Sequence, residues 1–570
     1  MFSQKLRNAM IAGLMASSSI ATAQTTGPNA GAYLAARQAG LAADFEYGAR
    51  YFTEALLADP THPALLENAL TTNIALARFE NAVAIANGMN DLGINRQISN
   101  IMIAVQAIKT KNWAAIFTAL EMGQQISPMV DGLSQGWAHM ALGEIDKAMM
   151  RFDEVSEAAG LQSFGVYHKA LAYASVGNLD EAIRVFDLTT QNGGPRHNRR
   201  SAIAHAQILT QLDRRDEALA LINTVFGDTL DPRLVDLRDR IKNNGAVPYN
   251  IVTTPTQGMG EIYLAVAEEL RSDAPDTYTL IYARAAEFLV PDNTEALLLV
   301  AGLLEDLGRF ELANETYTSV PRDDPAYAIA ELGRAEALRK GGNFEGAIEV
   351  LRAMTRDFPD MAAVYVSLGD TLRQSDQTEE ANTAYSQALD LYAPTDPARW
   401  IVYYTRAVTY HELDNWPKAE ADFRAALVFR PDQPQVLNYL GYSLVERGEK
   451  LDEALAMIEK AVAIQPQNGA IVDSLGWVLF QMGRYEEAVV HLENAAALEA
   501  VDPVVNDHLG DAFWAVGREI EARFQWNRAL SFSEDTSVDA DRIRRKLEIG
   551  LDAVLIEEGA EATRVADGIQ

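Results

Sequence analysis

The stretch "DSLGWVLFQMGRYEEA", Asp473 to Ala488, decides the fold because copies of it recur along the chain. Its Leu-Gly pair returns at steps of 34, 35 and 72 residues, the last being two repeats, as Leu475–Gly476, Leu509–Gly510, Leu440–Gly441 and Leu368–Gly369. Between Gly369 and Gly441, Ala407 takes the position of the missing small residue. A fixed period of this size predicts an array of similar structural units.

Three further anchors share the register of these small residues. An alanine follows twelve residues later, as in Gly476 with Ala488, Gly510 with Ala522, Gly369 with Ala381, Ala407 with Ala419, Ala335 with Ala347 and Ala301 with Ala313. A large side chain lies four residues further on, and a proline marks many repeat boundaries. These positions are Phe423, Tyr385, Leu351, Tyr317 and Trp526, and Pro291, Pro325, Pro359, Pro431 and Pro466.

This pattern resembles the tetratricopeptide repeat, a unit of two antiparallel helices. The resemblance implies an all-α superhelix of about 14 helix-turn-helix repeats in two halves. Packing physics agrees, because a glycine inside a helix costs about 1 kcal/mol relative to alanine. Glycines at one register therefore indicate that two helices approach too closely there for a larger side chain.

The repeat register breaks once in the middle of the chain. From Ala206 to Ala267 the step is 61 residues, and the segment contains "GAVPYNIVTTPTQGMG", which is rich in glycine and proline. We interpret it as a junction between two arrays. The expected organisation is a leader at 1–23, an N-terminal array with degenerate first repeats at 31–243, a junction at 244–258, a C-terminal array at 259–532, a capping helix at 533–558 and a disordered tail at 559–570.

The first residues have the pattern of a secretory signal peptide. Lys5 and Arg7 precede an apolar stretch, and Ala21 and Ala23 lie before Gln24. Cleavage is expected after Ala23. The predicted location is the periplasm of a Gram-negative cell, with association to the outer membrane through partners.

Composition excludes several classes of function. The chain has no cysteine, so it contains no disulfide, thiol nucleophile or lipidated cysteine. Removal of the leader takes away two basic residues and changes the formal charge from −32 to −34. Such a charge disfavours nucleic acids and anionic membranes as partners. The basic cluster "RHNRR", Arg196 to Arg200, is interpreted as a solvated loop.

No motif indicates catalysis, and we expect neither a metal nor a cofactor. The "HELDN" at His411 lacks the second histidine of a zinc helix. "GGNFEG", Gly341 to Gly346, is a turn between helices and follows no predicted strand. Glu486 and Glu487 diverge by about 100° on a helix, so they cannot form a facing carboxylate pair.

The resemblance also implies a binding wall on the first helix of each repeat. Aromatic and acidic residues interleaved on this wall suit an extended peptide or a basic helical segment as partner. An alternative is that several of the aromatics pack on neighbouring repeats as core. The wall residues expected in the C-terminal half are Tyr404, His411, Asn438, Tyr442, Asp473, Trp477, Phe480, Asp507, Asp511 and Trp514.

One known specificity of such repeats is missing here. Repeat domains that capture acidic chaperone tails are similar in placing a lysine at the fifth position and an asparagine at the ninth. The fifth position here holds Tyr404, Asn438, Asp473 and Asp507, and the ninth holds Val408, Tyr442, Trp477 and Asp511. An acidic tail would therefore be repelled.

The segment from Leu437 to Ala488 resembles, beyond the repeat itself, large periplasmic and outer-membrane repeat proteins of Gram-negative bacteria. Some of these are adaptor lipoproteins that recruit a carboxyl-terminal processing protease and its substrates. The resemblance implies a noncatalytic protein-binding scaffold or adaptor, although the lipidated cysteine is missing. The alternatives are a structural component of an envelope assembly or polysaccharide-export machine, and an enzyme of unrecognised type. The oligomeric state stays open.

Overall fold

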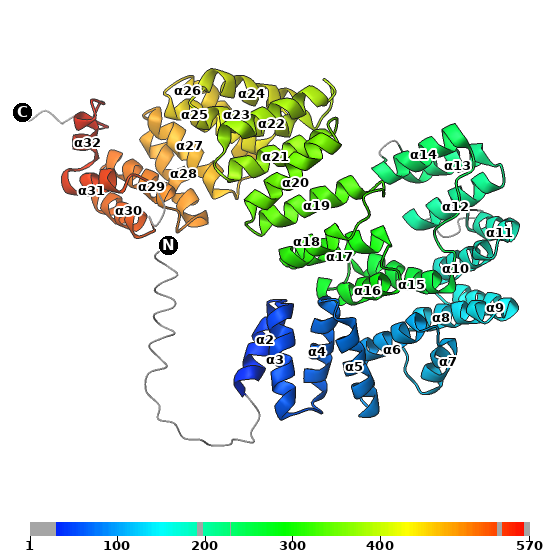
Figure 1. Cartoon of the computed structure of the whole chain (residues 1–570). Coiled ribbons are helices and arrows are strands. Elements are labelled where there is room, and N and C mark those ends of the chain that lie inside the picture. The colour runs from blue at the N-terminus through cyan, green and yellow to red at the C-terminus, as the bar shows by residue number, and fades with distance from the viewer. Residues whose placement is uncertain (1–29, 191–197, 228–229, 533–537, 564–570) are drawn as a thin grey trace, which may run out of the picture. The chain divides into compact units, whose positions relative to one another are not determined.

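The computed structural model describes residues 30–190, 198–227, 230–532 and 538–563. These ranges contain 31 helices and no strand, which confirms the all-α prediction. Apart from α14 and the terminal α31 and α32, the helices follow one another as fourteen successive pairs, as the period predicted (Figure 1). The predicted leader, residues 1–23, lies outside the described residues.

The chain divides into two compact units, and each is described by itself. The first ends at Asn343 and the second begins at Phe344. The helices of the first unit are α2 (Ala30–Leu41), α3 (Phe45–Ala58), α4 (Pro63–Ala75), α5 (Phe79–Asp91), α6 (Gln97–Lys109), α7 (Trp113–Glu121), α8 (Pro128–Ala141), α9 (Ile145–Glu157), α10 (Gln162–Ser175), α11 (Leu179–Thr190), α12 (Arg199–Gln211), α13 (Arg215–Phe226), α14 (Pro232–Asn244), α15 (Pro255–Leu270), α16 (Asp276–Leu289), α17 (Thr294–Asp306), α18 (Phe310–Thr318) and α19 (Tyr327–Lys340).

The second unit continues the helical array to the C-terminal end of the described chain. Its helices are α20 (Phe344–Asp357), α21 (Ala362–Gln374), α22 (Thr378–Leu391), α23 (Arg399–Glu412), α24 (Trp416–Phe429), α25 (Pro434–Glu446), α26 (Leu451–Ile464), α27 (Gly469–Gln481), α28 (Tyr485–Leu498), α29 (Pro503–Ala515), α30 (Glu519–Phe532), α31 (Ala540–Ile549) and α32 (Leu551–Glu557).

The small residues of the period lie where the two helices of a pair cross. A Cβ added at Gly476 on α27 would come within 2.4 Å of Leu492 on α28. At Gly369 on α21 it would come within 2.5 Å of Tyr385 on α22. In both pairs the contacting residue is the large anchor sixteen positions after the glycine. The turn follows the prediction too, because α27 ends at Gln481 and Gly483 has a φ of +73°.

The segment 244–258, predicted as the junction between two arrays, lies inside the first unit. Its Val247 is buried, and the backbone N–H of Val247 donates a 2.9 Å hydrogen bond to the hydroxyl of Thr210 on α12. Asn250 exchanges hydrogen bonds with the side chain of Gln207 on the same helix. The segment therefore packs against α12 and does not separate the two units.

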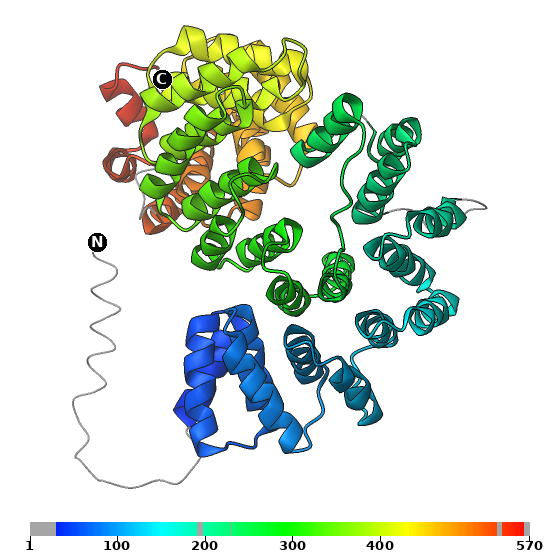
Figure 2. The ribbon, with the colours of Figure 1, turned by 45° about the vertical axis from the view of Figure 1, so that its right-hand side comes forward.

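Within the first unit, later helices pack against earlier ones. Helix α15 contacts α8, and α16 contacts α4 and α6. The views in Figures 1 and 2 both place the green helices α15 and α16 beside the blue and cyan helices of this unit. Arg284 on α16 donates a 3.1 Å hydrogen bond to the backbone oxygen of Ala75, and Phe288 packs on Phe79 with ring centroids 4.3 Å apart. The first helices α4, α6 and α8 are therefore covered by helices of the same chain.

The end of the second unit differs from the single capping helix that the sequence predicts. The helix breaks at Gly550, which has a φ of +84° and separates α31 from α32. A side chain at this position would meet the ring of Trp514 at 2.3 Å. Glycine is therefore required both by the backbone conformation and by the close approach of the tryptophan.

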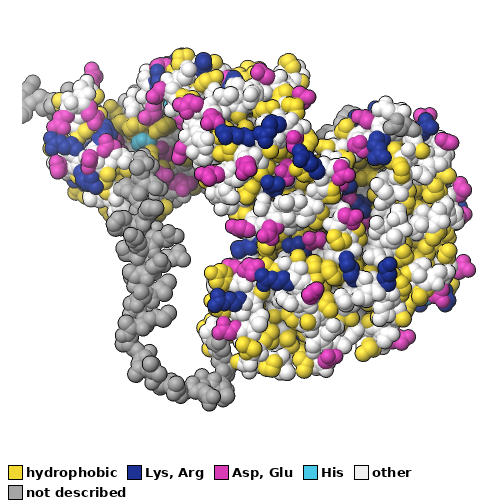
Figure 3. Space-filling model, viewed as in Figure 1, with side chains coloured by type: hydrophobic (Ala, Val, Ile, Leu, Met, Phe, Trp, Pro, Cys, Tyr) yellow, Lys and Arg dark blue, Asp and Glu magenta, His cyan; other side chains and the backbone are white. Residues whose placement is uncertain are grey.

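Charged and hydrophobic side chains both lie on the surface of the described helices. The face seen in Figure 3 carries acidic side chains interspersed with basic ones over both units. Among the described helices, none has both the length and the apolar character needed to cross a membrane.

Candidate partner-binding cleft

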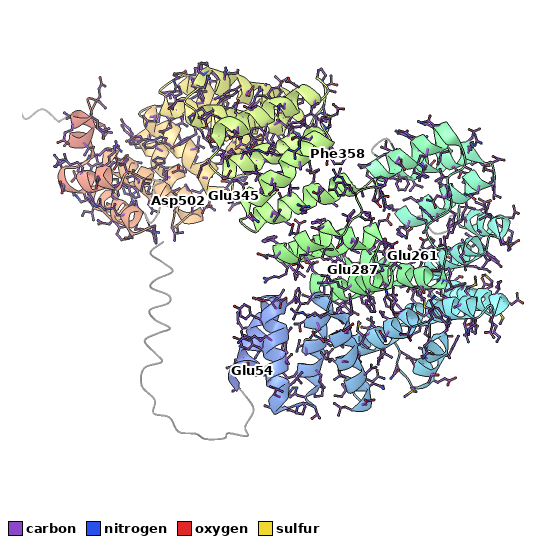
Figure 4. The ribbon with its side chains drawn as sticks, viewed as in Figure 1. Glu54, Glu261, Glu287, Glu345, Phe358 and Asp502 are labelled. Carbon is purple, nitrogen blue, oxygen red and sulfur yellow. The ribbon has the colours of Figure 1, made fainter. Side chains whose placement is uncertain are left out.

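The second unit contains a cleft of about 340 Å³ between the first helices of neighbouring repeats. Helices α23, α25 and α27 contribute side chains, and the start of α29 closes one end, near Asp502 (Figure 4). We refer to the surface that α23, α25, α27 and α29 form around this cleft as the inner wall. The lining residues are His411, Asn438, Tyr439, Tyr442, Ser443, Ala470, Asp473, Ser474, Asp502, Val504 and Val505.

Four of the ten wall residues expected from the sequence line this cleft. They are His411, Asn438, Tyr442 and Asp473, which come from three successive repeats. The structure thus brings together residues that are separated by up to 62 positions in the chain. Whether a partner contacts them stays a prediction.

Aromatic side chains form one side of the cleft. The ring nitrogen Nδ1 of His411 lies 3.1 Å from the hydroxyl of Tyr439, and the two rings meet edge to face. Burial raises the pKa of Tyr439 to about 12, and it also raises the pKa of Tyr442. Tyr404 does not line the cleft. Its ring packs on Phe423 and on Tyr439, which is a lining residue.

Asp473 is held in place by a histidine of the next repeat. Its buried carboxylate lies 2.9 Å from Nδ1 of His508 on α29. Burial alone lowers the pKa of His508, but the adjacent Asp473 reverses this, and the pKa lies above its ordinary value of 6.5. One carboxylate lone pair is thus engaged, while Asp473 still lines the cleft.

Trp477 and Phe480 lie on the same helix but outside the cleft lining. Their rings stack with centroids 5.0 Å apart, and the indole of Trp477 also stacks on His508 at 3.9 Å. The indole N–H donates a 2.8 Å hydrogen bond to Glu446 on α25. Phe480 is buried, so it contributes to the core, whereas Trp477 is only partly buried.

The last three predicted wall residues are occupied by the C-terminal helices. Lys546 on α31 is fully buried and donates hydrogen bonds to both Asp507 and Asp511 at 2.7 to 2.9 Å. The indole N–H of Trp514 donates to Asp552 on α32 at 2.8 Å, and only 8% of the residue is exposed. These three residues attach α31 and α32, which we call the cap, to the last repeat. The two aspartates supply the negative charge that a buried lysine requires.

Two carboxylates, of Asp473 and Asp502, are among the polar groups of the cleft. The amide oxygen of Asn438 is buried and has no hydrogen-bond partner among the described residues. Asp502 uses one carboxylate oxygen to accept the backbone N–H groups of Val504 and Val505, which caps α29. No lysine or arginine is among the lining residues.

A second cavity, of about 470 Å³, lies in the first unit and corrects one sequence interpretation. Arg200, expected in a solvated loop, is on α12 with only 5% of its side chain exposed. It pairs with Glu261 on α15 and with Glu295 on α17 (Figure 4 labels Glu261). The sequence pattern does not indicate these ion pairs, because the acidic partners are 61 and 95 residues away from Arg200.

Neighbouring charges extend this buried network. Arg233 on α14 lies 3.2 Å from both Glu295 and Asp324. Since most of these charges are paired with one another, the network joins α12, α14, α15 and α17 and serves the fold.

Sequence reasoning missed part of the cleft. Tyr439, Asp502 and Val505 line it, although none is at a wall position of the repeat pattern. Val504 is at the second position of its repeat, which faces the wall, but it was not among the expected residues. Asp502 is the N-cap of α29, which a helical-face argument does not include. Among the described residues, no group of three His, Cys, Asp or Glu side chains is placed to hold a metal ion.

Comparisons with known proteins identify the repeat. Residues 303–362 and 366–434 match a family model described as tetratricopeptide repeat, and residues 470–500 match another with the same description. A TPR repeat-containing protein of Pseudomonas aeruginosa is 29% identical over 156 residues, which are 27% of this chain. The match spans 26% of that relative, about a quarter of its length.

Two solved structures are among those to which this chain is similar. A chain of the APC/C hetero-tetramer Cut9–Hcn1 is 13% identical, with 90% of this chain and 96% of that chain covered and a TM-score of 0.38. YrrB, a TPR protein with an unusual peptide-binding site, is 18% identical, with 33% and 95% covered and a TM-score of 0.28. Both identities are too low to transfer a function.

Proposed function

We propose that this chain, which contains tetratricopeptide repeats, is a noncatalytic exported scaffold that binds a partner polypeptide against the inner wall of the second unit. The observation that carries the proposal is the cleft that Asn438, Tyr442 and Asp473 line together. Concave sites with aromatic walls and a few polar groups are the usual form of a ligand site.

The packing of the first unit also favours the second unit as the place where the partner binds. Its helices α15 and α16 pack on α4, α6 and α8, so these first helices already contact segments of their own chain. The cleft of the second unit remains a hollow of about 340 Å³ between its first helices. The cavity of about 470 Å³ in the first unit is lined by charges that pair with one another, so we place the partner at the second unit.

Export is part of the proposal and rests on the leader sequence. A charged start, an apolar stretch and Ala21 and Ala23 before Gln24 are typical of a cleaved signal peptide. Sequencing the N-terminus of the chain isolated from a periplasmic fraction tests this. We expect the chain to begin at Gln24, and an intact Met1 in the cytoplasmic fraction would contradict it.

The specific role proposed first is an adaptor that brings polypeptides to a periplasmic protease. It is favoured by the resemblance of residues 437–488 to large periplasmic and outer-membrane repeat proteins of Gram-negative bacteria, some of which are adaptors. A structural role in an envelope assembly or polysaccharide-export machine is the second candidate. Both roles use the same wall, and they differ in the identity of the partner.

Site-specific photocrosslinking in the producing bacterium tests the wall and separates the two roles. A photoreactive amino acid replaces Tyr442 in the cleft, and the matched control replaces Val490, which is 64% exposed on α28. We expect polypeptide adducts at Tyr442 that are missing at Val490. A protease among them supports the adaptor, and secretin, pilus or synthase subunits support the assembly role. Identical adducts at both positions, or none at Tyr442, would overturn the proposal.

A further inference from the structure

We infer that the cleft of the inner wall is a pocket for the cationic side chain of a lysine or arginine in the partner polypeptide. This inference rests on the proposed function and names the residue type that the wall recognises. Three features of the cleft carry it: one unpaired acceptor beside two carboxylates, aromatic side chains in the lining, and the way in which the same helical stack holds the buried Lys546.

The first feature is an unpaired acceptor beside two carboxylates. The buried amide oxygen of Asn438 has no donor among the described residues, and leaving a buried acceptor unpaired is unfavourable. The carboxylates of Asp473 and Asp502 line the same cleft, and no lysine or arginine does. An ammonium or guanidinium group brings several N–H donors and a positive charge, and it accepts nothing. It therefore complements this set of groups.

The second feature is the aromatic wall. Tyr439 and Tyr442 line the cleft beside the acceptors, together with the ring of His411. A cation over a tyrosine ring is attracted by the negative face of the ring, and more strongly when water is excluded. The apolar stem of lysine or arginine packs on such rings while the charged head reaches the carboxylates. Val504 and Val505 add apolar surface for the stem.

The third feature is a precedent within the same unit. Lys546 lies between Asp507 and Asp511, with Nζ 5.9 Å from the ring centroid of Trp526. Asp507 follows Asp473 by one repeat of 34 residues. The next position of the stack thus holds a lysine with two carboxylates and an aromatic ring. Asp473 has His508 as its own partner, and the cleft adds Asp502, Asn438 and two tyrosines, which are the groups offered to a cation of another polypeptide.

Selection from a library of random linear peptides against the purified chain, begun at Gln24, tests the inference. We expect the selected peptides to share a lysine or arginine and to lose binding when that residue becomes glutamine. Binding should also fall at least tenfold in the variant Tyr442→Ala. Tyr365→Ala, the same truncation on α21 outside the cleft, serves as the control.

Two charge variants sharpen the test because they act in opposite directions. Asn438→Asp adds a carboxylate and should tighten binding of the selected peptides by roughly two- to fivefold, the size of one partly exposed ion pair. Asp502→Asn keeps an oxygen that can cap α29, removes the charge, and should weaken binding by a similar factor. Asn494→Asp, the same charge change on exposed α28, should leave binding unchanged.

The possible outcomes separate this inference from the proposed function. Peptides that depend on Tyr442 but share no cationic residue would leave the proposed function standing and overturn the cation pocket. If no selected peptide responds to any inner-wall variant, the proposed function fails as well. If Asn438→Asp does not fold, Asp502→Asn alone decides, and unchanged binding in it counts against the inference.

Discussion

Arg200 on α12 and Glu261 on α15 form a bidentate ion pair, with donor–acceptor distances of 2.7 and 2.6 Å, and at most 5% of either side chain is exposed. The same carboxylate accepts a 2.8 Å hydrogen bond from the hydroxyl of Tyr167 on α10. The pair therefore attaches α15, the helix that packs on α8, to two other helices of the first unit.

Removing this arginine should destabilise the first unit strongly. Arg200→Gln leaves Glu261 buried without its counter-charge, and breaking such a pair costs about 3–5 kcal/mol. Urea denaturation followed by circular dichroism measures the loss. Arg200→Gln with Glu261→Gln should recover part of it, because the charge of Glu261 is gone and Glu295 keeps Arg233 as a partner. The exposed pair of Arg184 and Glu181 is the control, and Arg184→Gln should leave the free energy of unfolding nearly unchanged.

The buried His168 should make the folded chain less stable in mild acid. Its Nδ1 accepts a 3.0 Å hydrogen bond from the indole of Trp137, and burial lowers its pKa from 6.5 to about 4. Between pH 6.5 and pH 4, His168 is protonated in the unfolded chain and neutral in the folded chain. The free energy of unfolding is therefore not reduced by this histidine above pH 6.5, and it decreases as the pH falls below that value. The expected loss is about 3 kcal/mol.

The measurement is the free energy of unfolding at pH 7 and pH 4.5 in the native chain and in His168→Gln. The variant lowers stability at pH 7 through lost packing, but it should show a smaller fall between the two pH values. An equal fall in both proteins would mean that His168 does not titrate on unfolding in this range.

Glycine at a helix crossing and glycine on an open helix should respond oppositely to alanine. Gly476→Ala brings a Cβ within 2.4 Å of Leu492 and should cost roughly 1–3 kcal/mol. Gly88 on α5 has no atom within 4 Å of such a Cβ, so Gly88→Ala should stabilise by about 0.5–1 kcal/mol. Thermal melting compares the two. An unchanged melting temperature in Gly476→Ala would place the crossing point elsewhere.

Replacing the two tryptophans expected on the inner wall should have different effects on the stability of the protein. Trp514 is buried under α32, so Trp514→Ala should cost about 3–5 kcal/mol and release the cap. Trp477 is partly buried and stacks on His508, so Trp477→Ala should cost roughly 1–2 kcal/mol. Hydrogen exchange of residues 540–557 reports the release. Protection retained there in Trp514→Ala would contradict the role of Trp514 in attaching the cap.

Much of the fold was predictable from the sequence because the repeat is a local property. The distance of sixteen residues from Gly369 to Tyr385 lies within one helical pair, and the structure places the two in contact. The binding site was predictable only in part. His411, Asn438, Tyr442 and Asp473 follow from the helical face, whereas Asp502 and Val505 enter from a turn and a helix start.

The sequence by itself determined the helical pairs, their register and the small residues at their crossings, since each depends on contacts within about one repeat. Only the tertiary structure decided which charged residues are buried in ion pairs with distant partners. Lys546 reaches Asp511 across 35 residues, and Arg200 reaches Glu261 across 61. Such pairings depend on how the helices stack, and the hydrophobic period that sets each helix contains no information about which charge lies opposite another.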